Sequence, residues 1–149
     1  MAAINLLIGM DSKQPPVDDQ ALIDAATEVR DRAHAPYSGY RVGAAVLDEH
    51  GNVHVGCNVE NAAYPEGNCA EANAIGAMVA SGGRHIVAIA AVGGRNDIES
   101  CTPCGGCRQR ILEFADERTR IILVGADHCL DRYSIEELLP VSFSLPKQD

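Results

Sequence analysis

Two short segments of the sequence combine cysteines with other residues that can carry out chemistry. The first is Cys-Ala-Glu at residues 69–71, and the second is Pro-Cys-Gly-Gly-Cys at residues 103–107. In the second segment Pro103 suits a helix start, and Cys104 and Cys107 share one face of the first turn. Because a helix N-terminus lowers the pKa of a thiol, these cysteines are suited to act as thiolates.

Thiolates at two helix starts could hold a zinc ion and leave one coordination position open. Cys69, Cys104 and Cys107 would each bind Zn²⁺ at about 2.3 Å, with water in the fourth position. The pKa of such a water falls to about 7, so hydroxide forms near neutral pH. Glu71, two positions after Cys69, could serve as general base and then general acid without being a ligand. These residues predict a hydrolytic site with one zinc ion per chain.

Other arrangements of the same cysteines stay open. A redox-active C-x-x-C pair, or half of a structural zinc ribbon, needs only Cys104 and Cys107 and leaves Cys69 and Glu71 without a role. Cys101 forms a second C-x-x-C with Cys104, so a closed four-cysteine zinc site is a further alternative. An iron–sulfur run would need a fourth cysteine separated from Cys107 by three residues, and Ile111 stands there. The catalytic zinc site accounts for Cys69 and Glu71 as well.

The remaining cysteines and the histidines lack the spacing of metal ligands. Cys57 falls on a predicted strand and Cys129 after one, which favours packing roles for both. We expect surface or cap positions for the histidines, which are His34, His50, His54, His85 and His128.

Hydrophobic spacing predicts the elements that must position these segments. A helix stripe starts after Asp18 or Asp19, and apolar runs on both sides of a turn at 48–52 predict a β-hairpin. The helix predicted over 69–81 is apolar nearly all round, so we expect it in the core. The expected strands cover residues 42–47, 53–57, 86–92 and 121–124, and the later helices are one bearing Cys107, Ile111 and Phe114 and a short one that starts at Ser134 and stops at Pro140.

This order of elements predicts the fold class and the domain organisation. Helices that alternate with buried strands are typical of a layered α/β sandwich whose sheet is partly parallel. A chain of 149 residues suits one domain, and no repeat or long linker divides it. We therefore expect a leader at residues 1–17 and a single domain over residues 18–149.

Composition narrows the classes of partner. With 12 Lys and Arg against 21 Asp and Glu, the net charge of −9 disfavours a nucleic-acid polymer, whose phosphates need a basic stripe. A small neutral or cationic ligand fits better. The apolar runs are too short to cross a membrane, and the N-terminal run lacks the basic residues of a signal peptide. We expect the protein in the cytoplasm, where its 6 cysteines stay reduced.

The two cysteine segments together resemble the zinc nucleobase deaminases, with Cys in the place of the usual His. More narrowly, the sequence is similar to the small homotetrameric cytidine deaminases, and the resemblance runs from about residue 18 to 144. The matching segments are Val-Gly-Ala-Ala at 42–45, Asn-Val-Glu-Asn-Ala at 58–62, Tyr-Pro at 64–65, Cys-Ala-Glu at 69–71, Thr-Pro-Cys-Gly-Gly-Cys-Arg-Gln at 102–109 and Glu-Leu-Leu-Pro-Val-Ser-Phe at 137–143. The resemblance implies a three-layer α/β/α sandwich around a mixed five-stranded sheet.

The resemblance also implies an activity and its residues. The reaction is the zinc-dependent hydrolytic deamination of cytidine and deoxycytidine to uridine and deoxyuridine, with release of ammonia, as in pyrimidine salvage. Cys69, Cys104 and Cys107 match the zinc ligands. Glu71 matches the proton shuttle that protonates N3 of the pyrimidine and later hands a proton to the departing ammonia.

The substrate contacts implied by the resemblance come from several segments. Asn58 and Glu60 match a ribose-binding pair, which we place at alternate positions of a strand, on one side of it. Tyr40 falls beside the base, and the backbone of Ala70 meets the pyrimidine carbonyl. Phe143 matches an aromatic that closes the site of a neighbouring subunit in a homotetramer.

Two positions depart from the family pattern, and two rival functions remain. Ala72 stands where family members commonly carry Arg, and Arg41 stands where they usually carry Pro. The first rival is a deaminase of another cytosine compound such as blasticidin S. The second is a zinc-binding protein of the same fold without catalytic activity.

Overall fold

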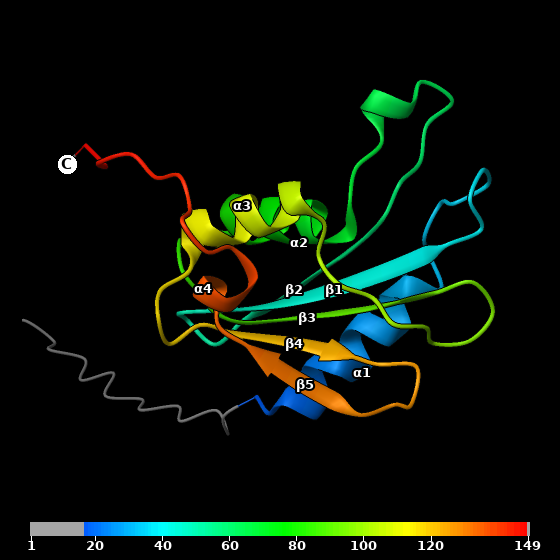
Figure 1. Ribbon diagram of the computed structural model, residues 1–149, viewed down its shortest axis with the longest axis horizontal. Helices are drawn as coiled ribbons and strands as arrows, with labels where there is room; N and C mark the ends of the chain where they lie inside the picture. The colour runs from blue at the N-terminus through cyan, green and yellow to red at the C-terminus, as the bar shows by residue number, and fades with distance from the viewer. Residues whose placement is uncertain (1–16, 149) are drawn as a thin grey trace, which may run out of the picture.

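The computed structural model describes residues 17–148 and contains a five-stranded sheet between layers of helices (Figure 1). The strands lie in the order β2-β1-β3-β4-β5, and only the β3–β4 pair is parallel. Their bounds are β1 Arg41–Asp48, β2 Val53–Cys57, β3 Ile86–Gly94, β4 Arg120–Val124 and β5 Leu130–Tyr133. The predicted α/β/α sandwich around a mixed five-stranded sheet is confirmed. The leader predicted at residues 1–17 lies outside the described residues, except for Val17.

Helices cover both faces of the sheet. Helix α1 (Asp19–Arg30) lies on one face, and α2 (Ala70–Ala80), α3 (Gly105–Phe114) and the short α4 (Ile135–Leu138) lie on the other (Figure 1). A single 3₁₀ turn, η1 (Tyr64–Glu66), interrupts the long segment between β2 and α2. Within residues 17–148, no helix is long and apolar enough to cross a membrane.

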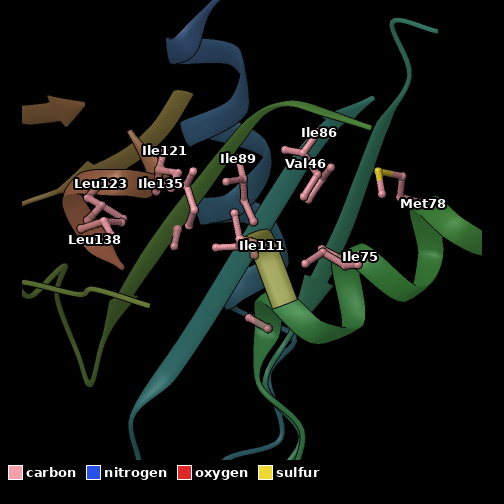
Figure 2. Packing of buried hydrophobic residues seen from close by; sticks show 14 residues of the cluster. Val46, Ile75, Met78, Ile86, Ile89, Ile111, Ile121, Leu123, Ile135 and Leu138 are labelled. Carbon is pink, nitrogen blue, oxygen red and sulfur yellow. The ribbon is translucent and has the colours of Figure 1, made fainter. Parts of the chain in front are cut away.

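One apolar cluster lies on each face of the sheet, between the strands and the helices, and alternate residues of a strand contribute to the two clusters. In β3, Ile89 and Ala91 face the cluster under α2, α3 and α4, whereas Ala88 and Ala90 face the cluster under α1. This period of two is expected for a strand buried on both faces. Figure 2 shows the first cluster, to which the sheet contributes Ile89 and Val46 and the helices contribute Ile111 of α3 and Ile75 of α2.

The fifth strand is one that hydrophobic spacing alone does not predict. Strand β5 has only four residues, Leu-Asp-Arg-Tyr, and its two central residues are exposed. It pairs with β4 through Val124–Leu130 and Ile121–Tyr133. A short edge strand with a charged centre has no alternating pattern to recognise. The same region corrects a second prediction, because Cys129 just before β5 is exposed and does not pack in the core.

Helix α2 is not buried all round, contrary to the prediction. Ile75 and Met78 enter the core, but Gly76 and Ala80 on the outer side are exposed. The helix lies unusually close to the sheet because of Gly56 in β2, where a Cβ atom would come within 2.6 Å of the carbonyl oxygen of Ala70. This close approach fixes the start of α2 against the sheet.

The β1–β2 hairpin contains a hydrogen-bonded pair of side chains that corrects the prediction for His54. Its Nε2 lies 2.7 Å from Oδ2 of the buried Asp48, and the His54 side chain itself is only 9% exposed. The other carboxylate oxygen of Asp48 accepts hydrogen bonds from the N–H groups of His50 and Asn52, at 2.9 Å each. His54 is therefore a structural residue of the turn rather than a surface residue.

We expect Asp48→Asn to lower the free energy of unfolding at neutral pH by about 2 kcal/mol, the usual value of hydrogen bonds to a buried charge. Burial raises the pKa of Asp48, but the hydrogen bonds from His54 and the turn outweigh it and leave the pKa below its ordinary value. The stabilisation is thus complete above the ordinary pKa and is lost as the pH falls through the lower pKa of the folded protein.

Urea unfolding at neutral and at strongly acidic pH checks this expectation. The difference between wild type and variant should shrink in acid. Asp131→Asn is the matched control, because Asp131 is exposed on β5. An Asp48→Asn variant as stable as the control would contradict the role of the pair.

Candidate metal centre and substrate cavity

Three cysteines meet where helices α2 and α3 begin. Cys69 is the N-cap of α2, and Cys104 is the N-cap of α3. Cys107 is the third residue of α3, and its N–H donates to Sγ of Cys104 at 3.4 Å. Since α2 and α3 contact each other on the same face of the sheet, their N-termini bring the thiols together.

The sulfur atoms are close enough to bind one ion. All three Sγ atoms lie within 4.8 Å of one another, and those of Cys69 and Cys104 are 3.9 Å apart. Sulfurs at tetrahedral corners, each about 2.3 Å from zinc, would be about 3.8 Å apart. A cluster of three sulfur donors therefore fits zinc, and Cys101 is not part of it.

Ionisation of the thiols differs from the expectation that helix starts favour three thiolates. Burial raises the pKa of Cys107, and the nearby Glu71 carboxylate raises it further. Burial also raises the pKa of Cys69. At Cys104 burial opposes ionisation too, but hydrogen bonds from Cys107 outweigh it and lower the pKa. A bound cation would provide the positive charge that stabilises all three thiolates.

Glu71 is a buried carboxyl group beside these sulfurs. It is the second residue of α2, its exposed fraction is only 4%, and its Oε2 accepts from Sγ of Cys107 at 3.5 Å. The side chain is outside the group of clustered ligand atoms but next to it. A carboxylate in this place can exchange protons with a molecule held in front of the sulfurs.

A cavity of about 360 Å³ opens in front of the cluster. Its wall includes Cys69, Ala70, Glu71 and Cys104 from the helix starts, together with Tyr40, Val42 and Asn58 and the segment Ser100, Cys101 and Thr102. This volume suits a small organic molecule. Val42 and the segment 100–102 are the parts of the wall that were not among the predicted substrate contacts, although that segment directly precedes the Pro-Cys-Gly-Gly-Cys segment.

Asn58 reaches this cavity from just beyond the end of β2. Its Oδ1 accepts from the N–H of Val42 at 2.8 Å, and its Nδ2 donates to the carbonyl of Tyr40 at 2.9 Å. The expectation that Asn58 and Glu60 share one side of a strand is wrong, because β2 ends at Cys57.

Glu60 lies in a neighbouring cavity, lined also by Tyr37, Ser38 and Tyr64. Its Oε1 accepts from the N–H groups of Tyr37 and Ser38 at 3.0 and 3.1 Å, and its Oε2 accepts from the Ser38 hydroxyl at 2.6 Å. The Ser38 hydroxyl bond is the main cause that lowers the pKa of Glu60. Within one chain, therefore, Glu60 and Asn58 line different cavities.

The two predicted aromatic contacts also differ in position. Tyr40 lines the cavity, and its hydroxyl donates to the carbonyl of Ser100 at 3.1 Å. Burial raises the pKa of Tyr40 to about 12. Phe143 is 67% exposed and lies along α3, where Gln109 donates to its carbonyl at 3.0 Å. It does not line the cavity of its own chain among residues 17–148.

Comparison with known families decides the affiliation of the chain. The model of the cytidine and deoxycytidylate deaminase zinc-binding region matches residues 16–123. The chain belongs to this deaminase family. The matched region includes every cysteine of the cluster and Glu71.

Individual deaminases resemble the chain over most of its length. It is 39% identical over 129 residues to the cytidine deaminase of Sporosarcina psychrophila, covering 86% of this chain and 93% of the relative. A crystal structure of cytidine deaminase from Burkholderia pseudomallei matches with a TM-score of 0.77 and 40% identity, covering 85% of this chain and 99% of that chain. The blasticidin-S deaminase of Bacillus cereus is 29% identical over 132 residues, covering 85% of this chain and 92% of the relative.

The structure shows the burial of the two residues that depart from the deaminase pattern and the contacts of the nearby Arg108. Ala72 is half-buried on α2, and Arg41 is exposed at the start of β1. Arg108 donates from Nε to the carbonyl of Pro103 at 2.9 Å and from Nη1 to that of Leu138 at 2.7 Å. Arg108 therefore ties the residue before Cys104 to α4.

We expect Cys101→Ala to bind as much zinc as the wild-type deaminase, because the Cys101 sulfur lies outside the cluster. Metal analysis of the purified protein gives the zinc content per chain. Cys104→Ala serves as the comparison and should lose zinc. A Cys101→Ala variant with reduced zinc content would instead support the closed four-cysteine site.

Proposed function

We propose that this chain is a hydrolase that deaminates cytidine and deoxycytidine to uridine and deoxyuridine with release of ammonia. The observation that carries the proposal is the buried Glu71 beside three clustered cysteine sulfurs at the wall of one cavity. The similarity to cytidine deaminases supports a cytosine nucleoside as the substrate. We assign the activity to one catalytic domain over residues 18–149.

The proposed roles at the metal centre follow from the donor set. Cys69, Cys104 and Cys107 would hold one zinc ion per chain. When bound, zinc lowers the pKa of a coordinated water and so supplies a nucleophile near neutral pH. Glu71 would accept a proton from the attacking water and deliver it to N3 of the pyrimidine. It would then accept the proton of the hydroxyl group that has been added at C4 and deliver it to the leaving ammonia.

The proposed substrate contacts use groups that still have free hydrogen-bonding capacity. The N–H of Ala70 is in the first turn of α2, where amides have no partner within the helix, so it can donate to the pyrimidine carbonyl. Asn58 Nδ2 has a second hydrogen besides the one it gives to Tyr40, and this can reach a ribose hydroxyl. Tyr40 offers its ring to the base. Glu60 lines the neighbouring cavity, so it offers its remaining lone pairs to a ribose hydroxyl where the nucleoside extends from one cavity into the other.

We further propose a homotetramer in which neighbouring subunits complete each site. Apolar side chains near the C-terminus, Val141, Phe143 and Leu145, are exposed, as are Gly76 and Ala80 on the outer side of α2. A second chain packed on these surfaces would bury them, and Phe143 would then reach a site other than its own. Light scattering should give about 63 kDa, four times the chain mass of 15.8 kDa. A mass near that of one chain would contradict the tetramer.

We place the protein in the cytoplasm, in pyrimidine salvage. The cysteines of residues 17–148 are free thiols, and a reducing compartment preserves them as metal ligands. An uncharged nucleoside needs no basic surface to attract it, so the net charge of −9 is compatible with this substrate. We propose no nucleic-acid polymer as a partner.

One alternative has specific support. The similarity to a blasticidin-S deaminase keeps that class of cytosine nucleoside open as a substrate. The decisive experiment offers purified protein cytidine, deoxycytidine, cytosine and blasticidin S, and follows ultraviolet absorbance and ammonia. We expect turnover of cytidine and deoxycytidine. Turnover of blasticidin S alone would favour the alternative, and no turnover of any compound would favour a non-catalytic zinc protein.

A further inference from the structure

Arg30 is a buried cation that the proposed reaction does not use. It is the last residue of α1, and its exposed fraction is 6%. Its nearest carboxylate, Asp31, lies 3.6 Å from Nη1 and is itself 70% exposed. Among residues 17–148, the Nε of Arg30 has no hydrogen-bond partner. Burying a guanidinium costs free energy when its charge and its N–H groups are only partly paired. The groups that Arg30 does contact are therefore important for its role.

The side chain of Arg30 holds the loop that leaves β3. Nη2 donates to the carbonyl of Gly94 at 2.9 Å and to that of Asp97 at 3.0 Å. The loop is tightly folded at this point. Gly94 has φ +148°, and a Cβ atom there would collide with the Asp97 carbonyl oxygen. The loop closes through a hydrogen bond of 2.8 Å from the N–H of Glu99 to the carbonyl of Gly93.

This loop leads directly into the wall of the substrate cavity. Ser100, Cys101 and Thr102 follow it without a break and line the cavity, and Cys104 comes two residues later. The far end of the loop is attached to Tyr40, through the hydroxyl that donates to Ser100. The Arg95 guanidinium also lies over the Tyr40 ring, 5.5 Å from its centre. Arg30 and Tyr40 thus hold the two ends of the same loop.

We propose that Arg30 is a positioning residue for the deamination: by fixing residues 94–99 it holds the wall at 100–102 in place against the bound nucleoside. The expected effect on substrate binding rests on the proposed function, whereas the hold of Arg30 on the loop does not. Arg30 does not line the cavity and acts through the loop. A wall that is not held in place must be ordered when the nucleoside binds, and the free energy of this ordering weakens substrate binding and so raises KM.

The test compares Arg30→Met and Arg30→Lys with wild type. Met keeps an unbranched apolar stem but donates no hydrogen bond, whereas Lys keeps the charge and has a shorter reach. Arg32→Met is the matched control, because Arg32 is exposed and pairs only with Glu28, at 3.3 Å, among the described residues. Each protein is measured for zinc content, for KM and kcat with cytidine, and for hydrogen exchange by mass spectrometry.

For Arg30→Met we expect faster amide exchange confined to residues 94–102, unchanged zinc content, and a KM raised roughly ten- to hundredfold. Arg30→Lys should be intermediate in exchange and KM, since an ammonium group can reach fewer of the two carbonyls. Arg32→Met should match wild type in every measurement. A purely structural role would instead lower the amount of folded enzyme, which reduces the apparent kcat and leaves KM unchanged.

Several results would overturn the proposal. One is wild-type exchange and KM in Arg30→Met, and another is exchange that accelerates evenly over the whole domain. If Arg30→Met does not fold, Arg30→Lys decides, and wild-type exchange and KM in that variant count against the proposal. If wild-type protein turns over no cytosine nucleoside, the proposed function fails, while local exchange at 94–102 still decides whether Arg30 holds the wall.

Discussion

Glu71→Gln is expected to lower the turnover of cytidine by roughly 10³- to 10⁴-fold while zinc content stays at the wild-type level. Gln has the same shape as Glu and fits the buried place at the start of α2. It can still form hydrogen bonds with substrate, but it can neither accept the proton of the attacking water nor deliver one to N3 or to ammonia. Initial rates from ultraviolet absorbance, together with metal analysis, measure both parts of the expectation.

The matched control for this substitution is Glu117→Gln, which makes the same chemical change at an exposed turn. It should keep wild-type activity and wild-type zinc content. Near-normal turnover by Glu71→Gln would show that another group carries the proton. Loss of zinc from Glu71→Gln would show that the carboxylate supports the metal centre, and its role would then need a different description.

Cys107→Ser is expected to remove both zinc and activity and to lower the melting temperature. Cys107 is fully buried at 0% exposure, between Cys104 and Glu71. A serine hydroxyl is a far weaker zinc ligand than a thiolate, and binding free energy at a site that exists only in the folded chain contributes directly to folding. Metal analysis and calorimetry with and without added zinc measure the effect, and added zinc should raise the melting temperature of wild type but not that of Cys107→Ser.

Cys129→Ser makes the same atomic change at an exposed cysteine outside the cluster. We expect this control to retain zinc, activity and the zinc-dependent melting temperature. If Cys107→Ser bound one zinc per chain and remained active, then Cys107 would not be a ligand and the open three-sulfur site would be wrong.

The parts of the fold that sequence predicted are those with strong local patterns. The apolar run at 86–92 has no polar face, and it forms most of β3, from the first residue of the strand onwards. The capping box at Ser134 and Glu137 is present as expected at the start of α4. Strand β5 lacks such a pattern, because its stability comes from pairing with β4 rather than from its own side chains. Only the family resemblance led to a fifth strand.

The candidate site divides in the same way. The proximity of Cys104 and Cys107 follows from helix spacing, and the α2–α3 contact adds Cys69. The sequence pattern predicts Asn58 and Glu60 on one side of a strand, but β2 ends at Cys57. Side chains alternate between the two faces only where the strand pairing continues.

Long-range pairs were beyond any local pattern. The contact of Arg30 with Gly94 spans 64 positions, and that of Tyr40 with Ser100 spans 60. The pairing of Asp48 with His54 was not predicted for another reason, because a histidine on a strand next to a polar turn resembles a surface residue until its burial is known. Tertiary packing, rather than local preference, determines each of these contacts.

The placement of Cys69 and Cys104 as helix N-caps has a consequence for how the centre is lost. The two N-cap residues are 35 positions apart in sequence, and in the proposed enzyme they would bind the same ion. Binding therefore closes a long loop of chain and anchors the first turns of α2 and α3 at once. Removing the ion frees both turns to fray, and Ala70 and Glu71 lie in one of them. We therefore expect chelation to remove the metal and, at the same time, to leave Glu71 without a fixed position.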